Sequence, residues 1–214
     1  MVSVAMERLD DWPVRPPTTV TAQLFGRSCE QTFLREELDA AIGGRGRLIL
    51  LGGEAGIGKT TLAKDVAREA AAHGATVLTG YCYDLTNTPP YGPWLDLVAA
   101  YRPTGSLPAP PSAFTGGTLT VVASHAELFA EVGRFVADLA TAIPTVVLLE
   151  DLHWADPASL ELLRSIAPRS KTLPLLLVVT YRVDEITRHH PFYRHFPALI
   201  READGIRLDL HRLD

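Results

Sequence analysis

A chain of 214 residues, 47% hydrophobic and 21% charged, is long enough to bury the core of one α/β domain. Its formal net charge of −5 argues against direct nucleic-acid binding, and no apolar run approaches the roughly 18 residues that a membrane helix needs. Cys29 and Cys82 have no metal-binding spacing and favour a reducing compartment, so we expect a cytoplasmic protein without a membrane partner.

The N-terminal part of the chain divides into a leader and the start of a domain. Residues 1–22 contain three prolines and no sustained periodicity, which predicts a flexible leader before a domain spanning 23–214. Ser28 and Gln31 have the spacing of a capping box, so a helix is expected to begin at Ser28 and to end at Gly43.

Further along the chain, apolar runs typical of strands alternate with stretches of helical periodicity. Strands are expected at 48–51, 76–80, 145–149, 175–180 and 206–210. Helices are expected at 61–72, 94–101, from Ser124 to about 143, 157–167 and 191–203. The proline-rich stretch 103–120 is predicted to be a long loop, either functional or mobile. This alternation indicates a mainly parallel sheet covered on both faces.

A phosphate-binding loop follows the first strand. The pattern G-x-x-x-x-G-K-[ST] lies between a strand and a helix, which is the context that its mechanism requires. Backbone N–H groups and the helix N-terminus can surround phosphate oxygens, Lys59 can reach the β- and γ-phosphates, and the Thr60 hydroxyl can bind Mg²⁺. The predicted nucleotide-binding residues are Gly53, Glu54, Ala55, Gly56, Ile57, Gly58, Lys59, Thr60 and Thr61.

Two acids, Glu150 and Asp151, directly follow the buried strand 145–149. The carboxyl edge of a parallel sheet is where ligands bind in open α/β folds. One carboxylate there can hold Mg²⁺, and a second can orient or deprotonate an attacking water. With Thr60, these acids make up the predicted Mg²⁺ site, and with Lys59 they are candidate catalytic residues.

Arg182 comes just past the strand 175–180, at the same edge of the sheet. An arginine in this position could contact the γ-phosphate and report its presence. It could equally be an exposed surface arginine, and the residues alone leave both interpretations open.

Four motifs occur in a recognisable order: Leu24-Phe25-Gly26-Arg27, the phosphate loop, the run L-E-D-L-H-W-A-D at 149–156, and Thr180-Tyr181-Arg182. In this order the chain resembles the AAA-like ATPase module of the STAND class. Such modules stand at the front of large LuxR-type transcriptional regulators and beside some bacterial nucleotide cyclases and protein kinases. The resemblance covers about residues 22–213.

The resemblance implies a P-loop NTPase three-layer sandwich with a mostly parallel five-stranded sheet. Its sensor strand would lie between the phosphate-loop strand and the acidic strand. It implies that ATP is the nucleotide and that Phe25, Gly26 and Arg27 lie near the base. It assigns Glu150 to the Mg²⁺ position, Asp151 to the water-activating position and Arg182 to sensing the γ-phosphate.

The chain departs from the family pattern in two ways. The Mg²⁺ position more usually holds aspartate, and the longer Glu150 leaves open an exchange of roles with Asp151. The helical lid, winged-helix segment and output domains that follow in the family are not in this sequence. The chain is therefore expected to be either a fragment, with these parts as partners in a longer protein, or a minimal stand-alone module.

The leading functional hypothesis is a Mg²⁺-dependent, slowly hydrolysing ATP switch that binds ATP and ADP and associates with itself according to nucleotide state. One alternative is a small-molecule kinase with the proline-rich 86–120 segment as lid, although only Arg102 lies in it. The other is a nucleotide-binding scaffold without turnover, against which intact Lys59, Thr60, Glu150 and Asp151 argue.

Overall fold

The computed structural model describes residues 26–84, 89–117 and 124–212. Its sheet has five strands in the order β2-β3-β4-β1-β5, and every neighbouring pair is parallel. The strands are β1 (Arg47–Gly53), β2 (Thr76–Tyr81), β3 (Thr145–Glu150), β4 (Leu175–Arg182) and β5 (Ile206–Leu210). The sensor strand β4 thus lies between the phosphate-loop strand β1 and the acidic strand β3, as predicted.

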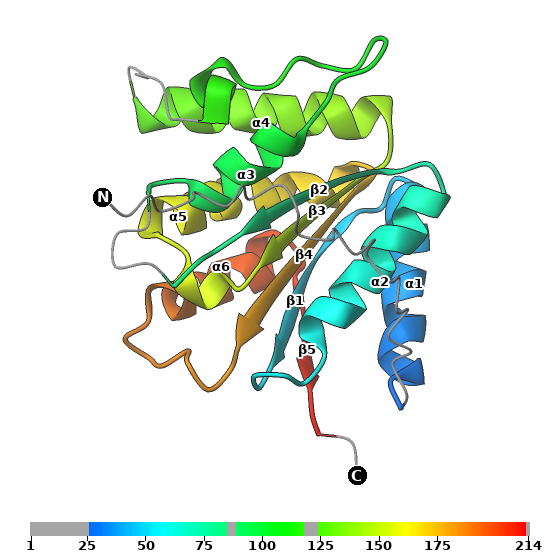
Figure 1. The fold of residues 1–214 in the computed structure, drawn as a ribbon, viewed down its shortest axis with the longest axis vertical. Coiled ribbons are helices and arrows are strands. Elements are labelled where there is room, and N and C mark those ends of the chain that lie inside the picture. Colours follow the sequence, from blue (N-terminus) through cyan, green and yellow to red (C-terminus); the bar gives the residue numbers. More distant parts are fainter. Residues whose placement is uncertain (1–25, 85–88, 118–123, 213–214) are drawn as a thin grey trace, which may run out of the picture.

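Helices cover both faces of this sheet (Figure 1). The α-helices are α1 (Ser28–Ile42), α2 (Lys59–Ala72), α3 (Gly92–Ala100), α4 (His125–Ala142), α5 (Pro157–Ile166) and α6 (Pro191–Glu202). Short 3₁₀ helices occupy Ser112–Gly117, Leu152–Trp154 and Ala167–Thr172. Within the described ranges, no helix combines the length and apolar character needed to cross a membrane.

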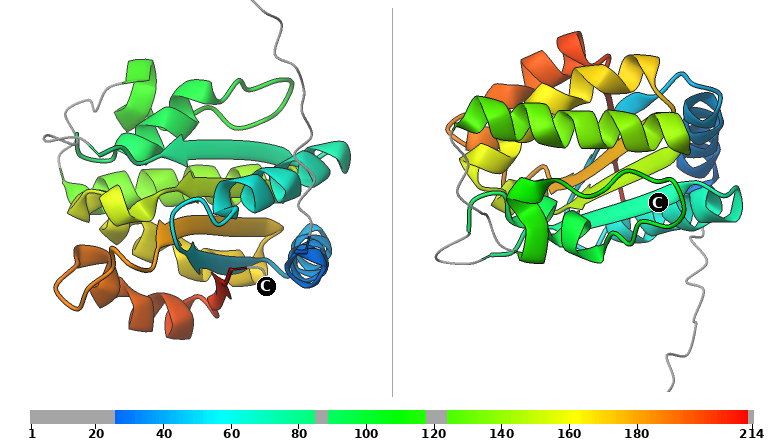
Figure 2. Two further views of the ribbon diagram at one scale, coloured as in Figure 1. Left: turned by 60° about the horizontal axis from the view of Figure 1, so that its bottom comes forward. Right: turned by 90° about the horizontal axis from the view of Figure 1, so that it is seen from above.

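The core divides along the strand pleat into two clusters, which makes the predicted three-layer sandwich. Alternate strand residues such as Ile49 and Val178 pack with α1 and α2 on one face. Their neighbours, such as Leu50 and Val179, pack with α3, α4, α5 and α6 on the other. The views in Figure 2 show this separation of the helices by the sheet. The inner strands β1, β3 and β4 are buried on both faces, as their continuous apolar runs require, and the edge strands β2 and β5 are partly exposed.

Two helix starts agree with the local sequence signals. The Ser124 side chain accepts a hydrogen bond from the Glu127 N–H at 3.2 Å and caps α4. Asp156 caps α5 by accepting from the Ser159 N–H at 2.9 Å, with Pro157 in the first helical position. Both caps satisfy N–H groups that the helices leave without an internal partner.

Two local predictions were wrong, and a third was right only in position. The helix α1 begins at Ser28, as predicted, but Arg27 occupies the cap position and no side chain caps the helix, so the capping box is absent. The helix α2 begins at Lys59, two residues before its predicted start, since left-handed Gly58 turns the chain directly into it. The predicted loop 103–120 contains a 3₁₀ helix in which Phe114 is fully buried. The predicted leader, 1–22, lies outside the described residues.

Replacing Ser124 with alanine should lower the free energy of unfolding by about 1 kcal/mol, because an N–H of the first turn of α4 loses its cap. Ser28 offers a matched control at a helix start without a capping bond, and Ser28→Ala should change stability by less than about 0.5 kcal/mol. Urea denaturation of both variants measures the difference. Equal losses would mean that the Ser124 bond contributes nothing.

Candidate functional site

The predicted phosphate loop is the turn between β1 and α2. Gly56 and Gly58 have φ of 72° and 103°, in the left-handed region that side chains other than glycine rarely adopt. Glu54, Ala55 and Gly56 are exposed. The first backbone N–H groups of α2 have no acceptor inside the helix, and no side chain caps them. The loop therefore offers N–H donors at a helix N-terminus, which suits an anion.

Lys59 lies folded over this loop. Its Nζ donates to the Gly53 carbonyl at 2.9 Å and to the Glu54 carbonyl at 2.7 Å, and the residue is 6% exposed. Burial lowers the pKa of Lys59, an effect that nearby Asp151 opposes and nearby Arg182 reinforces. The ammonium group thus lies among the loop, Asp151 and Arg182, and its present partners are neutral carbonyls.

Glu150 ends β3 on the face that packs against α2. Its residue is 2% exposed, and Lys64 of α2 approaches it at 3.7 Å. Its Oε1 is buried without a hydrogen-bond partner among the described residues. A buried carboxylate oxygen without a donor is costly, and a cation or its water ligands would satisfy it. The Thr60 hydroxyl, at the start of α2, likewise makes no hydrogen bond within the described part of the chain.

Asp151 leaves the strand in a different direction from Glu150. Its φ is 60°, and its N–H donates to the Thr180 hydroxyl of β4 at 3.0 Å. Its side chain is 34% exposed, and Oδ1 lies 4.0 Å from Nδ1 of His153. The two adjacent acids therefore have different surroundings: Glu150 lies in the interior beside α2, and Asp151 lies at the open edge of the sheet.

Arg182, at the end of β4, pairs in register with Gly53 of the loop strand. Its guanidinium donates to Glu185 at 2.6 Å and lies over the Trp154 ring, 5.1 Å from the ring centroid. The side chain is 31% exposed. Arg182 is therefore next to the loop and held by a carboxylate that sequence reasoning did not single out.

His153 lies between the carboxylates of Asp151 and Glu185. Its side chain is fully buried, neither ring nitrogen has a hydrogen-bond partner among the described residues, and Nε2 is 3.6 Å from Glu185. Burial lowers the pKa of His153, so the neutral ring is favoured. It packs on Trp154 with 4.5 Å between ring centroids.

Arg27 joins three parts of the domain beside the loop. The residue is 3% exposed, and its guanidinium donates to Glu30 at 3.0 Å, to the Ile57 carbonyl at 3.3 Å and to the His211 carbonyl at 2.6 Å. Gly26 precedes it with φ of 78°, and Phe25 lies outside the described residues. Arg27 thus ties α1 and the end of β5 to the phosphate loop.

We expect Arg27→Met to lower the free energy of unfolding by about 2–3 kcal/mol, because buried carbonyls and a carboxylate lose a charged donor. The exposed Arg68, which pairs with Asp65 inside α2, is a suitable control, and Arg68→Met should cost less than about 1 kcal/mol. Thermal and urea unfolding of both variants decide the matter. A loss no larger than that of Arg68→Met would show that the Arg27 contacts do not stabilise the fold.

A small cavity of about 150 Å³ adjoins the loop on the β5 side. Ile57, Val183 and Leu210 give it apolar walls, and Glu54 and Arg212 lie at its polar side. These last two are joined by an ion pair of 2.6 Å between Glu54 Oε2 and a terminal nitrogen of Arg212. The cavity lies beside the Ile57 and His211 carbonyls that Arg27 holds.

The comparisons with known proteins agree with this geometry. The sequence model of a family described as "AAA ATPase domain" matches residues 23–179, most of the chain. The chain belongs to the AAA ATPase domain family. As a member of this family it is a nucleotide-binding module of the P-loop class.

The similar proteins are longer than this AAA ATPase domain, which aligns with only part of each. An uncharacterized protein of Rhizobium meliloti (strain 1021) is 28% identical in an alignment of 189 residues that covers 74% of this chain and 18% of that protein. A structure of Drosophila ORC bound to GC-rich DNA and Cdc6 aligns with TM-score 0.51 and 15% identity over 93% of this chain and 64% of that one. Drosophila ORC bound to AT-rich DNA and Cdc6 gives TM-score 0.50 and 15% identity over 85% of this chain and 57% of that one. At these identities the ORC likeness shows the fold alone.

The AAA ATPase domain also contains site residues that the sequence did not reveal. Glu185 holds Arg182, and Arg212 holds Glu54. The spacing of Arg182 and Glu185 could have hinted at the first pair, but these residues lie in a turn with no regular pattern. The second pair joins positions 158 residues apart, and only the fold brings them together.

Proposed function

We propose that this domain is a Mg²⁺-dependent, ATP-binding switch that hydrolyses ATP slowly in a cytoplasmic signalling or transcriptional regulator of the LuxR type. The observation that carries the proposal is the pairing of an open phosphate loop with the buried Glu150 on the α2 side, whose Oε1 accepts no hydrogen bond and lies 3.7 Å from Lys64 Nζ. A loop that binds phosphate and a buried carboxylate at the same end of the sheet are the two halves of a Mg²⁺-nucleotide site.

In the proposal, phosphates bind to the N–H groups of residues 54–61 and to Lys59. Lys59 exchanges two neutral carbonyl acceptors for anionic oxygens, and charge-assisted hydrogen bonds are the stronger kind. Burial and exclusion of water at its Nζ make that exchange more favourable than it would be at the surface. The small cavity lined by Ile57, Val183 and Leu210 would receive the base, with Gly26 and Arg27 behind the loop.

The Mg²⁺ ion would be held by the Thr60 hydroxyl and by Glu150, with Asp151 as the alternative acid. Bound there, the metal would neutralise phosphate charge. No group of three or more His, Cys, Asp or Glu side chains among the described residues could hold a metal by itself, so phosphate oxygens and water would complete the coordination shell. The Glu150 Oε1, which accepts no hydrogen bond within the described residues, fits this arrangement.

Asp151 and Arg182 would perform the steps at the γ-phosphate. Asp151 is partly exposed and can accept a proton from an attacking water. Arg182 would leave Glu185 for the γ-phosphate when ATP is bound and return after hydrolysis. This exchange of partners gives two states of the turn after β4, as a switch requires.

The proposal also includes partners of this domain. These are attached regulatory or output domains and other copies of the chain, with which it associates according to nucleotide state, and direct nucleic-acid binding is not among its proposed functions. The larger size of the Rhizobium meliloti relative supports the attached domains.

The alternative of a small-molecule kinase has less support. The segment that would form its lid is anchored in the core, with Trp94 at 1% and Phe114 at 0% exposure. Arg102 donates to the Tyr101 carbonyl next to it. A mobile, arginine-bearing lid over the phosphates is therefore not supported by this part of the chain.

Product analysis separates the three hypotheses. The chain is incubated with Mg²⁺ and ATP, with and without a pool of small metabolites, and ADP and free phosphate are counted. The switch predicts equal, slow release of both, and loss of both in Asp151→Asn. ADP formation that exceeds phosphate release only when metabolites are added would establish a kinase. Nucleotide binding without either product would establish a scaffold.

A further inference from the structure

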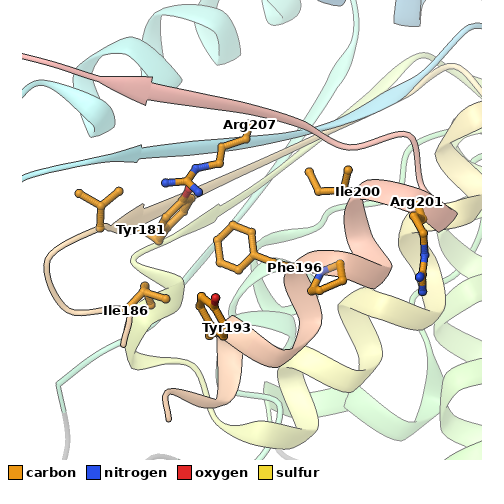
Figure 3. A pocket seen from close by; sticks show the side chains of 9 residues that line it. Tyr181, Ile186, Tyr193, Phe196, Ile200, Arg201 and Arg207 are labelled. Carbon is orange, nitrogen blue, oxygen red and sulfur yellow. The ribbon is translucent and has the colours of Figure 1, made fainter. Parts of the chain in front are cut away.

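A second, larger pocket lies between α6, the end of β4 and β5 (Figure 3), and it shares Val183 and Arg207 with the small cavity beside the phosphate loop. Its volume is about 470 Å³, within the range of about 300–1,000 Å³ that small-molecule sites occupy. Its lining comes from the end of β4 and the turn after it, from α6 and from β5. The lining residues are Tyr181, Val183, Ile186, Tyr193, Phe196, Pro197, Ile200, Arg201 and Arg207.

The walls of this pocket are apolar and already ordered. Tyr181 packs edge-to-face on Phe192 and Phe196, with ring centroids 5.4 and 5.2 Å apart. The Tyr181 hydroxyl donates to Asp209 at 3.3 Å, and burial raises the pKa of this phenol, so the floor stays uncharged. The pocket therefore needs no rearrangement of aromatic side chains before an apolar molecule can enter it.

The α6 helix contributes an apolar face to the lining of this pocket. Tyr193, Phe196, Pro197 and Ile200 recur at the i, i+3, i+4 and i+7 positions of one helical face. Tyr193 is 45% exposed and Ile200 39%, although both are large and apolar. Exposed apolar side chains gathered around a concavity mark binding surfaces more often than isolated ones do.

A chain turn bounds the pocket at each end, which favours a small molecule over a helix laid through a groove. At one end α6 turns directly into β5, where the Gly205 N–H donates to the Leu199 carbonyl at 3.2 Å. At the other end the turn after β4 contributes Val183 and Ile186 (Figure 3). A docking helix, about 10 Å wide, needs a groove that runs past its ends.

The charged residues of the lining favour a ligand with a negative charge. Its two ionic residues are both arginines, and no carboxylate lines the pocket. Arg207 is already paired with Asp209 at 2.7 Å, and it lies over the Phe196 ring at 5.8 Å from the centroid. Arg201 is exposed and has no ion-pair partner within the described ranges. An acidic group would therefore find an available cation at the rim beside Ile200.

We infer that this pocket binds a small amphiphilic anion, whose apolar chain or ring fills the aromatic cavity and whose acidic group pairs with Arg201. Tyr181 and Val183 flank Arg182 in the chain, so an occupant would touch the strand end next to the candidate phosphate sensor. Binding at the pocket does not depend on that role or on nucleotide.

The test uses three probes with the same ten-carbon chain and different head groups: decanoate, decanol and decylammonium. Calorimetric titration of the nucleotide-free chain, below the micelle concentration of each probe, should give saturable 1:1 binding of decanoate, at least about 10-fold tighter than of the other two. Such a preference corresponds to one charged contact. No saturable decanoate binding, or equal affinity for all three probes, would overturn the inference.

Variants locate the binding. Ile200→Asp places a charge in the apolar lining and should weaken decanoate binding at least about 10-fold. Arg201→Glu should reverse the preference in favour of decylammonium. Arg194→Glu changes the same charge on an exposed position of α6 outside the lining, and it should leave the decanoate affinity within twofold. Because the three positions are exposed, thermal unfolding is expected to stay near the wild-type value and is measured for each. Folded Ile200→Asp and Arg201→Glu proteins that bind decanoate like the wild type would contradict the assignment.

Discussion

Replacing Lys59 with alanine is expected to weaken ATP binding by about 10- to 100-fold, the loss of one or two charge-assisted hydrogen bonds. Lys59 Nζ is buried at the loop and donates only to the Gly53 and Glu54 carbonyls, so it is available to phosphate oxygens on binding. Equilibrium titration with a fluorescent or calorimetric readout in the presence of Mg²⁺ measures the change. The same variant removes two internal hydrogen bonds and should also loosen the nucleotide-free loop.

Lys171 provides the matched control for this experiment. It is a lysine of the same domain, paired with Asp204 at 3.1 Å far from the loop in sequence and fold. Lys171→Ala should leave the ATP affinity within twofold of the wild type. ATP binding that survives in Lys59→Ala would show that the loop does not bind phosphate in the proposed way.

The two acids at the end of β3 should separate binding from turnover. Glu150→Gln removes the buried carboxylate that faces α2, so ATP binding should require about 10-fold more Mg²⁺, a loss of one metal contact. The free energy of unfolding without nucleotide should change by no more than about 1 kcal/mol, because the pair lost with Lys64 is long and its lysine is half-exposed. Asp151→Asn should bind ATP nearly as the wild type does and lose about 10²- to 10⁴-fold in turnover, the usual contribution of a general base.

These variants test the assignment of roles as well as the roles themselves. They are measured by Mg²⁺ titration of ATP binding and by single-turnover hydrolysis. The reversed result, with the Mg²⁺ requirement changed in Asp151→Asn and turnover lost in Glu150→Gln, would show that the longer Glu150 side chain has exchanged roles with Asp151. No effect of either substitution would remove both acids from the site.

Much of the fold was predictable because its signals are local. The strands predicted at 145–149 and 175–180 and the helices predicted from Ser124 and from 157 depend on neighbours in the chain, and the structure confirms them. The role of Arg27 was not predictable in this way. The start of α1 at Ser28 was predicted, but Arg27 occupies the cap position, and its side chain is held by the distant Ile57 and His211 carbonyls.

The candidate site was predictable as a set of residues but not as a set of contacts. The motifs name Lys59, Glu150, Asp151 and Arg182, and the parallel sheet necessarily brings them to one edge. Their present partners come from positions with no motif, such as Glu185 in a turn and the Gly53 carbonyl at a strand end. The pocket beside α6 was also hidden, because its walls come from β4, α6 and β5 and are assembled only by the fold.

The most direct test of the central proposal is a titration of the wild-type chain with ATP in Mg²⁺ and again in EDTA. The proposed site predicts saturable binding of one ATP per chain in Mg²⁺ and binding at least about 10-fold weaker in EDTA, since the metal joins the phosphates to Thr60 and Glu150. Equal affinity in the two buffers would contradict the metal site, and no saturable binding in either would contradict the ATP switch itself.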